Sequence, residues 1–525
     1  MRKRLIEVLL ASLLLASSAL AFAQDPAKDA DAAPDKDAKA AKKDEKPIPP
    51  EKTSVSHGSV EVGGRAIRYT ATAGNVLIRD DKTDKPNASV FYVAYTAERG
   101  RHDADRPITF FYNGGPGSSS VWLHMGSVSP VRVESASADA TSPPPYHLGP
   151  NPYSLIDKSD LVFIDAVGTG FSTPVGKGEG KDFWGVDQDL HAFAKAITRY
   201  VTINQRWNSP KFLFGESYGT TRSAGLVNVL QSQGMAFNGV VLLSSILNYG
   251  ANSPGLDQTY IGALPTFAAI AWYHDKVPNK PADLNAFLNE ARAFAIGDYA
   301  TALAKAQNLS AAELDASATK LSRYTGLSPQ YLKDANLRVS QSRFRKELLR
   351  DERRTVGRYD GRYEGIDLDA AGENPDYDAS DTAIAGAFTA AFNNYLEGTL
   401  KYASDAAYKT TSFDIIRAWD WKHEQPGARF PQRQPYVAGD LARAMRENPK
   451  LQVLSANGYF DLATPFFATE YDLSHMQLDP SLRGNLEFRY YPSGHMVYLN
   501  VDALKQFKSD LDAFYDRAVG AERRY

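Results

Sequence analysis

The sequence predicts an α/β fold with a mostly parallel central sheet and a helical insertion. Two strand patterns predict the sheet, and a block of helical patterns predicts the insertion. Residues 58–74, 75–81 and 88–96 alternate apolar with polar residues between turn signals, which is typical of β-hairpins. Farther along, short and nearly continuous apolar runs alternate with helical patterns, as expected for parallel strands with helices on both faces. These runs are residues 160–170, 211–215, 239–246 and 451–458, whereas residues 107–115 are grouped with the alternating strands of the opening.

The helical insertion is expected over residues 251–380, between a first core part at 53–250 and a second at 381–525. Residues 281–299, 310–324 and 328–349 have helical patterns with Ser or Pro start signals and no strand signal between them. Helices inserted beyond the carboxyl ends of the strands would form a lid or a substrate wall. The alternative is a structural appendage remote from the site. Residues 351–380, rich in Tyr, Gly and Asp, are expected to be irregular.

Composition excludes several classes of function. A chain of 525 residues that is 43% hydrophobic can bury a large core, so disorder cannot describe most of it. The net charge of −3 comes from interspersed signs and predicts no nucleic-acid partner. Cysteine and the H-E-x-x-H pattern are absent, and the glycine-rich stretches lack nucleotide-binding spacings, so neither a metal nor another cofactor is predicted.

The N-terminus is expected to direct export rather than to fold. Residues 1–23 combine the basic stretch "MRKR", an apolar stretch and the cleavage pattern Ala21-Phe22-Ala23, as in a signal peptide. A retained membrane anchor is the rival interpretation, and no cysteine is available for lipid attachment. Residues 24–52 are rich in Ala, Lys, Asp and Pro, which predicts a disordered linker. The mature protein is therefore expected to be periplasmic or secreted, without a stable membrane anchor.

A serine between two glycines follows one of the predicted strands. In "KFLFGESYGTTR", Gly215, Ser217 and Gly219 match G-x-S-x-G between an apolar strand and a helical pattern. In that context the serine occupies a sharp turn that exposes its hydroxyl, and the glycines leave room for the backbone. Ser217 is the candidate nucleophile.

The base and the acid should follow the serine in the order Asp or Glu, then His. His495 comes after the strand-like "LEFRYYP" in the turn "SGHM", whereas His475 lies in a helical pattern and is expected to be a packing or surface residue. Asp461 lies in the loop after the strand at 451–458, and Asp472 is a weaker candidate within a helix. His495 and Asp461 are therefore the favoured base and acid.

In acyl transfer, negative charge develops on the carbonyl oxygen of the substrate, and fixed N–H groups must stabilise it by hydrogen bonds. One is expected from Tyr218, the residue after the serine, and the second from the loop "FFYNGGPGSSS" at residues 110–120. By itself that loop is equally compatible with an anion-binding nest or an ordinary turn.

Taken together, "NGGPGSSS", "NPYSL", "DLVFIDAVGTGFS", "GESYGT", "NGYFDLATP" and "SGHMV" resemble the serine carboxypeptidases, exported enzymes of the α/β-hydrolase fold that remove C-terminal amino acids. The resemblance covers about residues 105–250 and 385–510. It implies a triad of Ser217, Asp461 and His495, and an oxyanion hole from the N–H groups of Gly115 and Tyr218. It also implies that Asn113, Gly114 and Glu216 hold the terminal carboxylate of peptide substrates.

The sequence departs from the family pattern at three positions. Ser118 stands where the family usually has cysteine, Phe111 where it has tryptophan, and Ser127 where it has a supporting acid. The last departure affects the network around Glu216. If Glu216 grips a carboxylate, it must be protonated, so activity on peptides should be relatively favoured at mildly acidic pH.

Three functions remain open at this point. The favoured one is an exported serine carboxypeptidase that forms an acyl-enzyme on Ser217. An esterase or acyltransferase could use the same triad on a non-peptide substrate, since a fold and a triad do not fix the acyl donor. A binding protein without turnover is the third. Side-chain preference, biological substrate and oligomeric state are not determined by the sequence.

Overall fold

The computed structural model describes residues 45–98, 105–135 and 137–520. The predicted signal peptide and most of the predicted linker lie outside these residues. The described end of the linker lies along the core, where Lys46 and Gly176 exchange backbone hydrogen bonds and the Lys52 N–H donates to Asn75 Oδ1 at 2.9 Å. Within the described ranges, no helix is long and apolar enough to cross a membrane.

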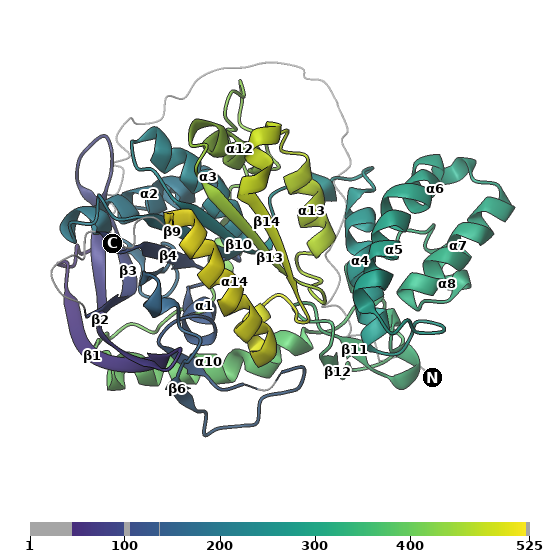
Figure 1. The fold of residues 1–525 in the computed structure, drawn as a ribbon, viewed down its shortest axis with the longest axis horizontal. Coiled ribbons are helices and arrows are strands. Elements are labelled where there is room, and N and C mark those ends of the chain that lie inside the picture. Colours follow the sequence, from purple (N-terminus) through teal and green to yellow (C-terminus); the bar gives the residue numbers. More distant parts are fainter. Residues whose placement is uncertain (1–44, 99–104, 136, 521–525) are drawn as a thin grey trace, which may run out of the picture. The chain divides into compact units, whose positions relative to one another are not determined.

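A single large sheet organises the described residues (Figure 1). Its ten strands follow the order β1-β2-β3-β7-β4-β9-β10-β13-β14, with the short β8 paired to β3. The strands from β1 to β3 are antiparallel and β3 is antiparallel to β7, whereas every pairing from β7 to β14 is parallel. The predicted mostly parallel sheet with opening hairpins is confirmed. The strands are β1 Thr53–Val62, β2 Arg65–Arg79, β3 Pro86–Ala97, β4 Ile108–Tyr112, β7 Asp160–Ile164, β8 Thr173–Pro174, β9 Lys211–Ser217, β10 Gly239–Ser245, β13 Gln452–Gly458 and β14 Leu486–Tyr491.

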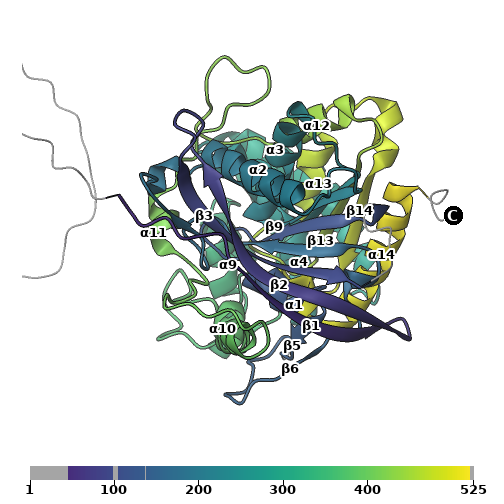
Figure 2. The same cartoon turned by 90° about the vertical axis from the view of Figure 1, so that its left-hand side faces the viewer.

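Helices cover both faces of the parallel part of the sheet, which explains why its strands are apolar without alternation (Figure 2). Successive side chains of a strand point to opposite faces, so Phe110 packs in one core and Phe111 in the other. One core is shared with α1 Val121–Gly126, α10 Ala379–Gly398 and α14 Val501–Val519. The other is shared with α2 Val186–Ile203, α3 Tyr218–Ser232 and α12 Ala438–Glu447.

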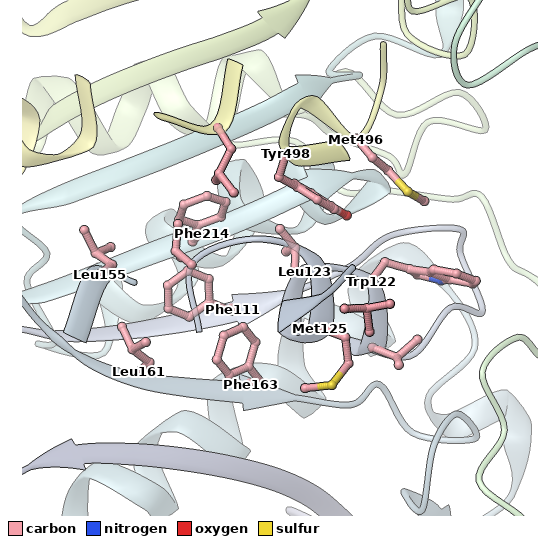
Figure 3. Packing of buried hydrophobic residues seen from close by; sticks show 14 of the residues in the cluster. Phe111, Trp122, Leu123, Met125, Leu155, Leu161, Phe163, Phe214, Met496 and Tyr498 are labelled. Atoms are coloured by element: carbon pink, nitrogen blue, oxygen red, sulfur yellow. The ribbon is translucent and has the colours of Figure 1, made fainter. Parts of the chain in front are cut away.

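Three phenylalanines on adjacent strands pack together in one of the two cores (Figure 3). Phe111 on β4 is in register with Phe163 on β7 and with Phe214 on β9. The Phe111 ring centroid lies 4.6 Å from that of Phe163 and 4.8 Å from that of Phe214. Such aromatic pairs stabilise beyond their burial by about 0.5–1.5 kcal/mol each. This packing fixes the ends of β4 and β9, from which the glycine-rich loop and Ser217 follow.

The segment after β10 folds into helices around a core of its own. The Phe267 and Phe344 rings stack there with centroids 4.0 Å apart. The predicted Ser start signals act as caps: the Ser310 hydroxyl accepts from the Glu313 N–H in a capping box, which satisfies donors at the helix start. The helices are α4 Gln258–Tyr273, α5 Leu284–Phe294, α6 Ala300–Lys305, α7 Ala311–Thr325, α8 Pro329–Asp334 and α9 Gln341–Glu347.

The helical pattern at residues 328–349 forms two short helices rather than one. After α8, Asn336 and Leu337 adopt positive φ values of 51° and 61°, a conformation that cannot continue a right-handed helix. Ser340 then caps α9 by accepting from the Arg343 N–H. The sequence period continues through the break because both helices bury residues in the same core.

The core of the insertion also contains residues of the loop that bears Asp461. Phe460, Leu462 and Phe466 pack with the apolar residues of the inserted helices. The insertion is therefore in contact with a loop of the candidate site. The chain returns from it through the short pair β11 Thr355–Val356 and β12 Glu364–Gly365, within the segment that the sequence left irregular. The remaining elements are β5 Val131–Val133, β6 Leu148–Pro150, α11 Phe413–Ala418 and α13 Phe466–Ser474.

Candidate active site

Ser217 lies at the point where β9 ends and α3 begins. Its backbone has φ 61° and ψ −129°, a sparsely populated conformation for a residue with a side chain. Both flanking positions need glycine because a side chain would not fit there. A Cβ on Gly215 would overlap the Gly219 carbonyl oxygen, and a Cβ on Gly219 would lie 2.7 Å from the Tyr112 carbonyl oxygen. The G-x-S-x-G pattern thus marks a turn that holds the Ser217 hydroxyl above the sheet.

His495 and Asp461 form a buried, hydrogen-bonded pair. His495 Nδ1 lies 2.7 Å from Asp461 Oδ2, and both side chains are almost inaccessible to solvent. The carboxylate also accepts the N–H groups of Ala463 and Thr464, at 2.8 and 3.0 Å, and the Thr464 hydroxyl at 2.6 Å. This network fixes the carboxylate, which in turn favours a proton on Nδ1 and leaves Nε2 able to accept one.

A pocket of about 320 Å³ brings the predicted residues together. Asp461 stands behind it, in contact with His495. The weaker candidates lie elsewhere: His475 is exposed and stacks on Tyr471, and Asp472 accepts a hydrogen bond from Asn248. The predicted residues that line the pocket are Asn113, Gly114, Gly115, Glu216, Ser217, Tyr218 and His495.

The glycine-rich loop after β4 packs directly on the start of α3. A Cβ on Gly114 would overlap the backbone nitrogen of Tyr218, so only glycine allows this approach. Gly115 has φ 107°, which also favours glycine. The first N–H groups of a helix have no partner within the helix, so the Tyr218 N–H is a donor at the pocket. The two residues predicted to form an oxyanion hole therefore lie on adjoining backbone segments.

Glu216 and Asn113 form the polar floor of the pocket. Asn113 Nδ2 donates to Glu216 Oε1 at 2.9 Å, while Asn113 Oδ1 accepts the Leu123 N–H at 2.9 Å. Arg222 donates to the Asn113 carbonyl and pairs with Asp189 beneath α3, so Asn113 is held from several sides. This arrangement presents a carboxyl group and an amide to the pocket in fixed positions.

Burial and neighbouring charges raise the pKa values of two groups in the site. Burial raises the pKa of the Glu216 carboxyl to about 7, and the positive charge of protonated His495 opposes that effect. Burial lowers the pKa of the His495 imidazole, but the charge and hydrogen bond of Asp461 outweigh burial and raise it above the ordinary 6.5. Near pH 7, Glu216 can therefore be protonated, and the raised pKa of His495 makes its imidazole a stronger base than a free one.

Ser127, which stands where the family has a supporting acid, does not line the pocket. Its hydroxyl donates to the Leu123 carbonyl at 2.5 Å, and its own carbonyl accepts from Asn151. A second acid besides Glu216 lines the pocket, namely Asp381 in the first turn of α10, where burial raises its pKa.

Two segments that sequence reasoning did not assign complete the pocket. Arg358 and Tyr359 reach it from the chain returning from the insertion, and Thr411 and Ile416 reach it from residues 409–418. The second segment is bound to the glycine-rich loop, since the Ser412 N–H donates to the Gly117 carbonyl at 2.8 Å. No short motif marks either segment, because its place depends on pairing with distant parts of the chain.

Comparisons with known proteins identify the family and the fold. The model of the serine carboxypeptidase family matches residues 70–334, just over half of the chain. The pheromone-processing carboxypeptidase KEX1 of Saccharomyces cerevisiae is 35% identical over 134 residues, which are 25% of this chain and only 17% of that protein. The crystal structure of KEX1(delta)p, a prohormone-processing carboxypeptidase from S. cerevisiae, covers 85% of this chain and 91% of its own, with a TM-score of 0.51 and 16% identity. That structural similarity confirms the predicted α/β-hydrolase fold, and the family match identifies the chain as a member of the serine carboxypeptidase family.

Proposed function

We propose that the protein is an exported serine carboxypeptidase that releases C-terminal amino acids from peptides through an acyl-enzyme on Ser217. The observation that carries the proposal is the buried Glu216 carboxyl, which lines one pocket with Ser217 and His495 and is bonded to Asn113. A general esterase would not need a carboxyl group poised to be protonated beside its nucleophile. A carboxypeptidase does, because its substrate brings a carboxylate to the scissile bond.

The proposed reaction follows from the positions of these groups. The Ser217 hydroxyl attacks the scissile carbonyl carbon while His495 Nε2 takes its proton, and the N–H groups of Gly115 and Tyr218 bind the oxyanion. His495 then gives the proton to the departing amine, so the C–N bond breaks and the free amino acid leaves. Water attacks the acyl-enzyme with His495 as base, which releases the shortened peptide and restores the serine.

The same chemistry orients the substrate in the pocket. The leaving amine must lie beside His495, so the released residue occupies the His495 side, with its carboxylate at Glu216 and Asn113. A protonated Glu216 donates a hydrogen bond to that carboxylate, whereas an ionised one repels it. Binding should therefore raise the pKa of Glu216 further.

Export is proposed from the N-terminal pattern alone. Residues 1–23 have the features of a signal peptide, and a chain without cysteine folds in an oxidising compartment without disulfide exchange. N-terminal sequencing of the mature protein from a periplasmic or secreted fraction is expected to begin at Gln24.

The direct test of the proposal compares a peptide with its C-terminal amide. Purified protein is incubated with each, and the masses of the products are followed over time. Stepwise loss of single residues from the free acid, with the amide essentially uncleaved, is expected. Cleavage of simple esters with no shortening of either peptide would favour the esterase alternative instead.

Glu216 should set the alkaline limit of activity on free-acid peptides. As pH rises through about 7, Glu216 ionises and kcat/KM should fall, approaching tenfold per pH unit, because the carboxylate then repels the substrate. Below the pKa of His495 activity should also fall, since the protonated imidazole cannot act as base. Glu216→Gln keeps a hydrogen-bond donor at every pH and should remove the alkaline fall.

The pH profile of kcat/KM, measured for both enzymes with the same peptide, checks this expectation. An activated ester without a terminal carboxylate serves as the control substrate, and its profile should lack the alkaline fall even in the wild type. If kcat/KM of the wild type for the peptide keeps rising to pH 9, the proposed role of Glu216 is excluded.

A further inference from the structure

The chain that returns from the helical insertion is bound to the loop that carries Asp461. The Gly361 N–H donates to the Phe460 carbonyl at 2.9 Å, and the Leu462 N–H donates to the Arg358 carbonyl at 3.1 Å. These two bonds involve the residues on either side of Asp461. Residues 357–363, called here the return segment, therefore hold the acid's loop through backbone pairing that does not depend on side-chain identity.

The return segment is also bound to the loop that carries His495. The His495 N–H donates to the Tyr359 carbonyl at 2.6 Å. The Arg362 guanidinium donates to the Pro492 carbonyl at 3.1 Å and to the Ser493 hydroxyl at 3.4 Å. Gly494 has no room for a side chain here, because a Cβ would overlap the Tyr359 carbonyl and Asp360. One short segment thus joins the acid's loop to the base's loop.

The return segment is itself fixed by buried polar contacts. Arg362 and Asp360 form an ion pair whose side chains are only 7% and 5% exposed. At the start of α10, the Ser380 hydroxyl accepts the N–H groups of Tyr359 and Asp360, at 3.0 and 3.2 Å. Satisfied buried networks of this kind rigidify their surroundings. The backbone of Tyr359 is therefore held from both sides.

From this held backbone, the Tyr359 side chain reaches the catalytic imidazole. Its ring centroid lies 5.1 Å from that of His495, with the two planes inclined at 33°. Tyr359 lines the same pocket as Ser217 and His495. An aromatic ring at this distance limits rotation of the imidazole, covers part of its surface from water and favours its protonated form through the ring face.

The geometry points to Tyr359 as a positioning residue for His495. This inference rests on the proposed function, in which His495 is the base, and goes beyond it by assigning a catalytic contribution to the insertion. Tyr359 fixes the direction of Nε2 toward Ser217, while Asp461 fixes the tautomer. The helical insertion is then a structural part of the catalytic apparatus, because it delivers the segment that orients the base.

Charged groups also act on His495, in addition to the Tyr359 ring. Asp461 and Glu216 raise the pKa of the imidazole, and the Arg358 guanidinium lowers it. Arg358 Cζ lies 5.2 Å from the centroid of the Tyr359 ring, so loss of the ring could alter its position. A phenylalanine at position 359 keeps the ring for both neighbours and removes only the hydroxyl.

The test uses Tyr359→Leu and Tyr359→Phe in the full-length protein, with Tyr377→Leu as the matched control. Tyr377 is 39% exposed and does not line the pocket. Each variant is assayed for kcat and KM on one peptide and for the rate at which a small sulfonyl fluoride modifies Ser217. That reagent reacts with Ser217 only if His495 acts as the base, but it contains no C-terminal amino acid that could contact Tyr359. Its reaction rate therefore reports on the function of His495 alone. Thermal unfolding verifies that each variant is folded.

Tyr359→Leu is expected to lower kcat by about 10- to 100-fold, with KM changed by less than about threefold, as for a small misplacement of a catalytic group. The sulfonylation rate should fall by the same factor. For both Tyr359→Phe and Tyr377→Leu, kcat, KM and the sulfonylation rate should each stay within about twofold of the wild type.

A folded Tyr359→Leu that reacts with the sulfonyl fluoride at the wild-type rate would overturn the inference. A rise in KM alone would then identify Tyr359 as a substrate contact. Equal losses of kcat in Tyr359→Phe and Tyr359→Leu would also contradict the inference, because the effect would then come from the hydroxyl and not from the ring. Failure of the proposed function is distinguishable, since it would leave the wild type itself unable to shorten peptides.

Discussion

Replacing Ser217 with alanine is expected to lower kcat for peptide hydrolysis by about 10⁶-fold, because it removes the nucleophile on which the acyl-enzyme forms. The fold should be retained. Alanine keeps the Cβ that already occupies the strained turn at φ 61°, and the Ser217 hydroxyl contributes no cap to α3.

Two measurements check this result. Peptide shortening is followed at high enzyme concentration, and labelling by a fluorophosphonate is followed by mass spectrometry. Wild-type protein should gain one label, on the peptide that contains Ser217, and the alanine variant none. The matched control is Ser232→Ala, at the far end of α3, where the exposed hydroxyl bonds only to the Val229 carbonyl. If Ser217→Ala kept more than about 1% of wild-type kcat, the nucleophile would have to be another residue.

Replacing Asp461 with asparagine is expected to lower kcat by about 10⁴-fold while the loop keeps its shape. The asparagine oxygen can still accept the Ala463 and Thr464 N–H groups that now bond to Asp461 Oδ1. Its NH₂ group would then face His495 Nδ1 and force the proton onto Nε2. In that tautomer the imidazole cannot take the proton of the Ser217 hydroxyl.

The control for Asp461→Asn is Asp472→Asn, because Asp472 is the other acid that the sequence offered in this region. Asp472 is buried and bonded to Asn248, but it has no contact with His495. Its replacement should leave kcat within about threefold of the wild type. A larger loss from Asp472→Asn than from Asp461→Asn would reverse the assignment of the acid.

Much of the site was predictable because each piece has a local signature. The turn at Ser217 requires glycine on both sides, and the approach of the loop at Gly114 to Tyr218 requires glycine for the same steric reason. The short apolar run before Ser217, with the runs at 160–170, 239–246 and 451–458, predicted parallel strands, whose carboxyl ends meet at one edge of the sheet. The order of serine, acid and histidine then selected Asp461 and His495, and their hydrogen bond places them together.

The helical insertion shows where local signatures were insufficient. Ser310 and Ser340 were recognisable as helix starts, yet the break at Asn336 and Leu337 was not, because both neighbouring helices keep the apolar period of one continuous helix. Both short helices bury apolar side chains, among them Leu332 and Phe344, in the core of the insertion, so the break belongs to tertiary packing. Propensity is a weak guide where packing decides.

The sequence by itself determined the mostly parallel sheet and the sharp turn at Ser217, since these depend on steric limits and apolar patterns within a few residues. It offered Asp461 and His495 as candidates through their order along the chain. Only the tertiary structure decided that Tyr359 lies against His495 and that Asp381 lines the pocket while Ser127 does not. The physical reason is that these contacts join residues more than 100 positions apart. They are selected by the packing of the insertion on the core, and no local preference of the chain encodes them.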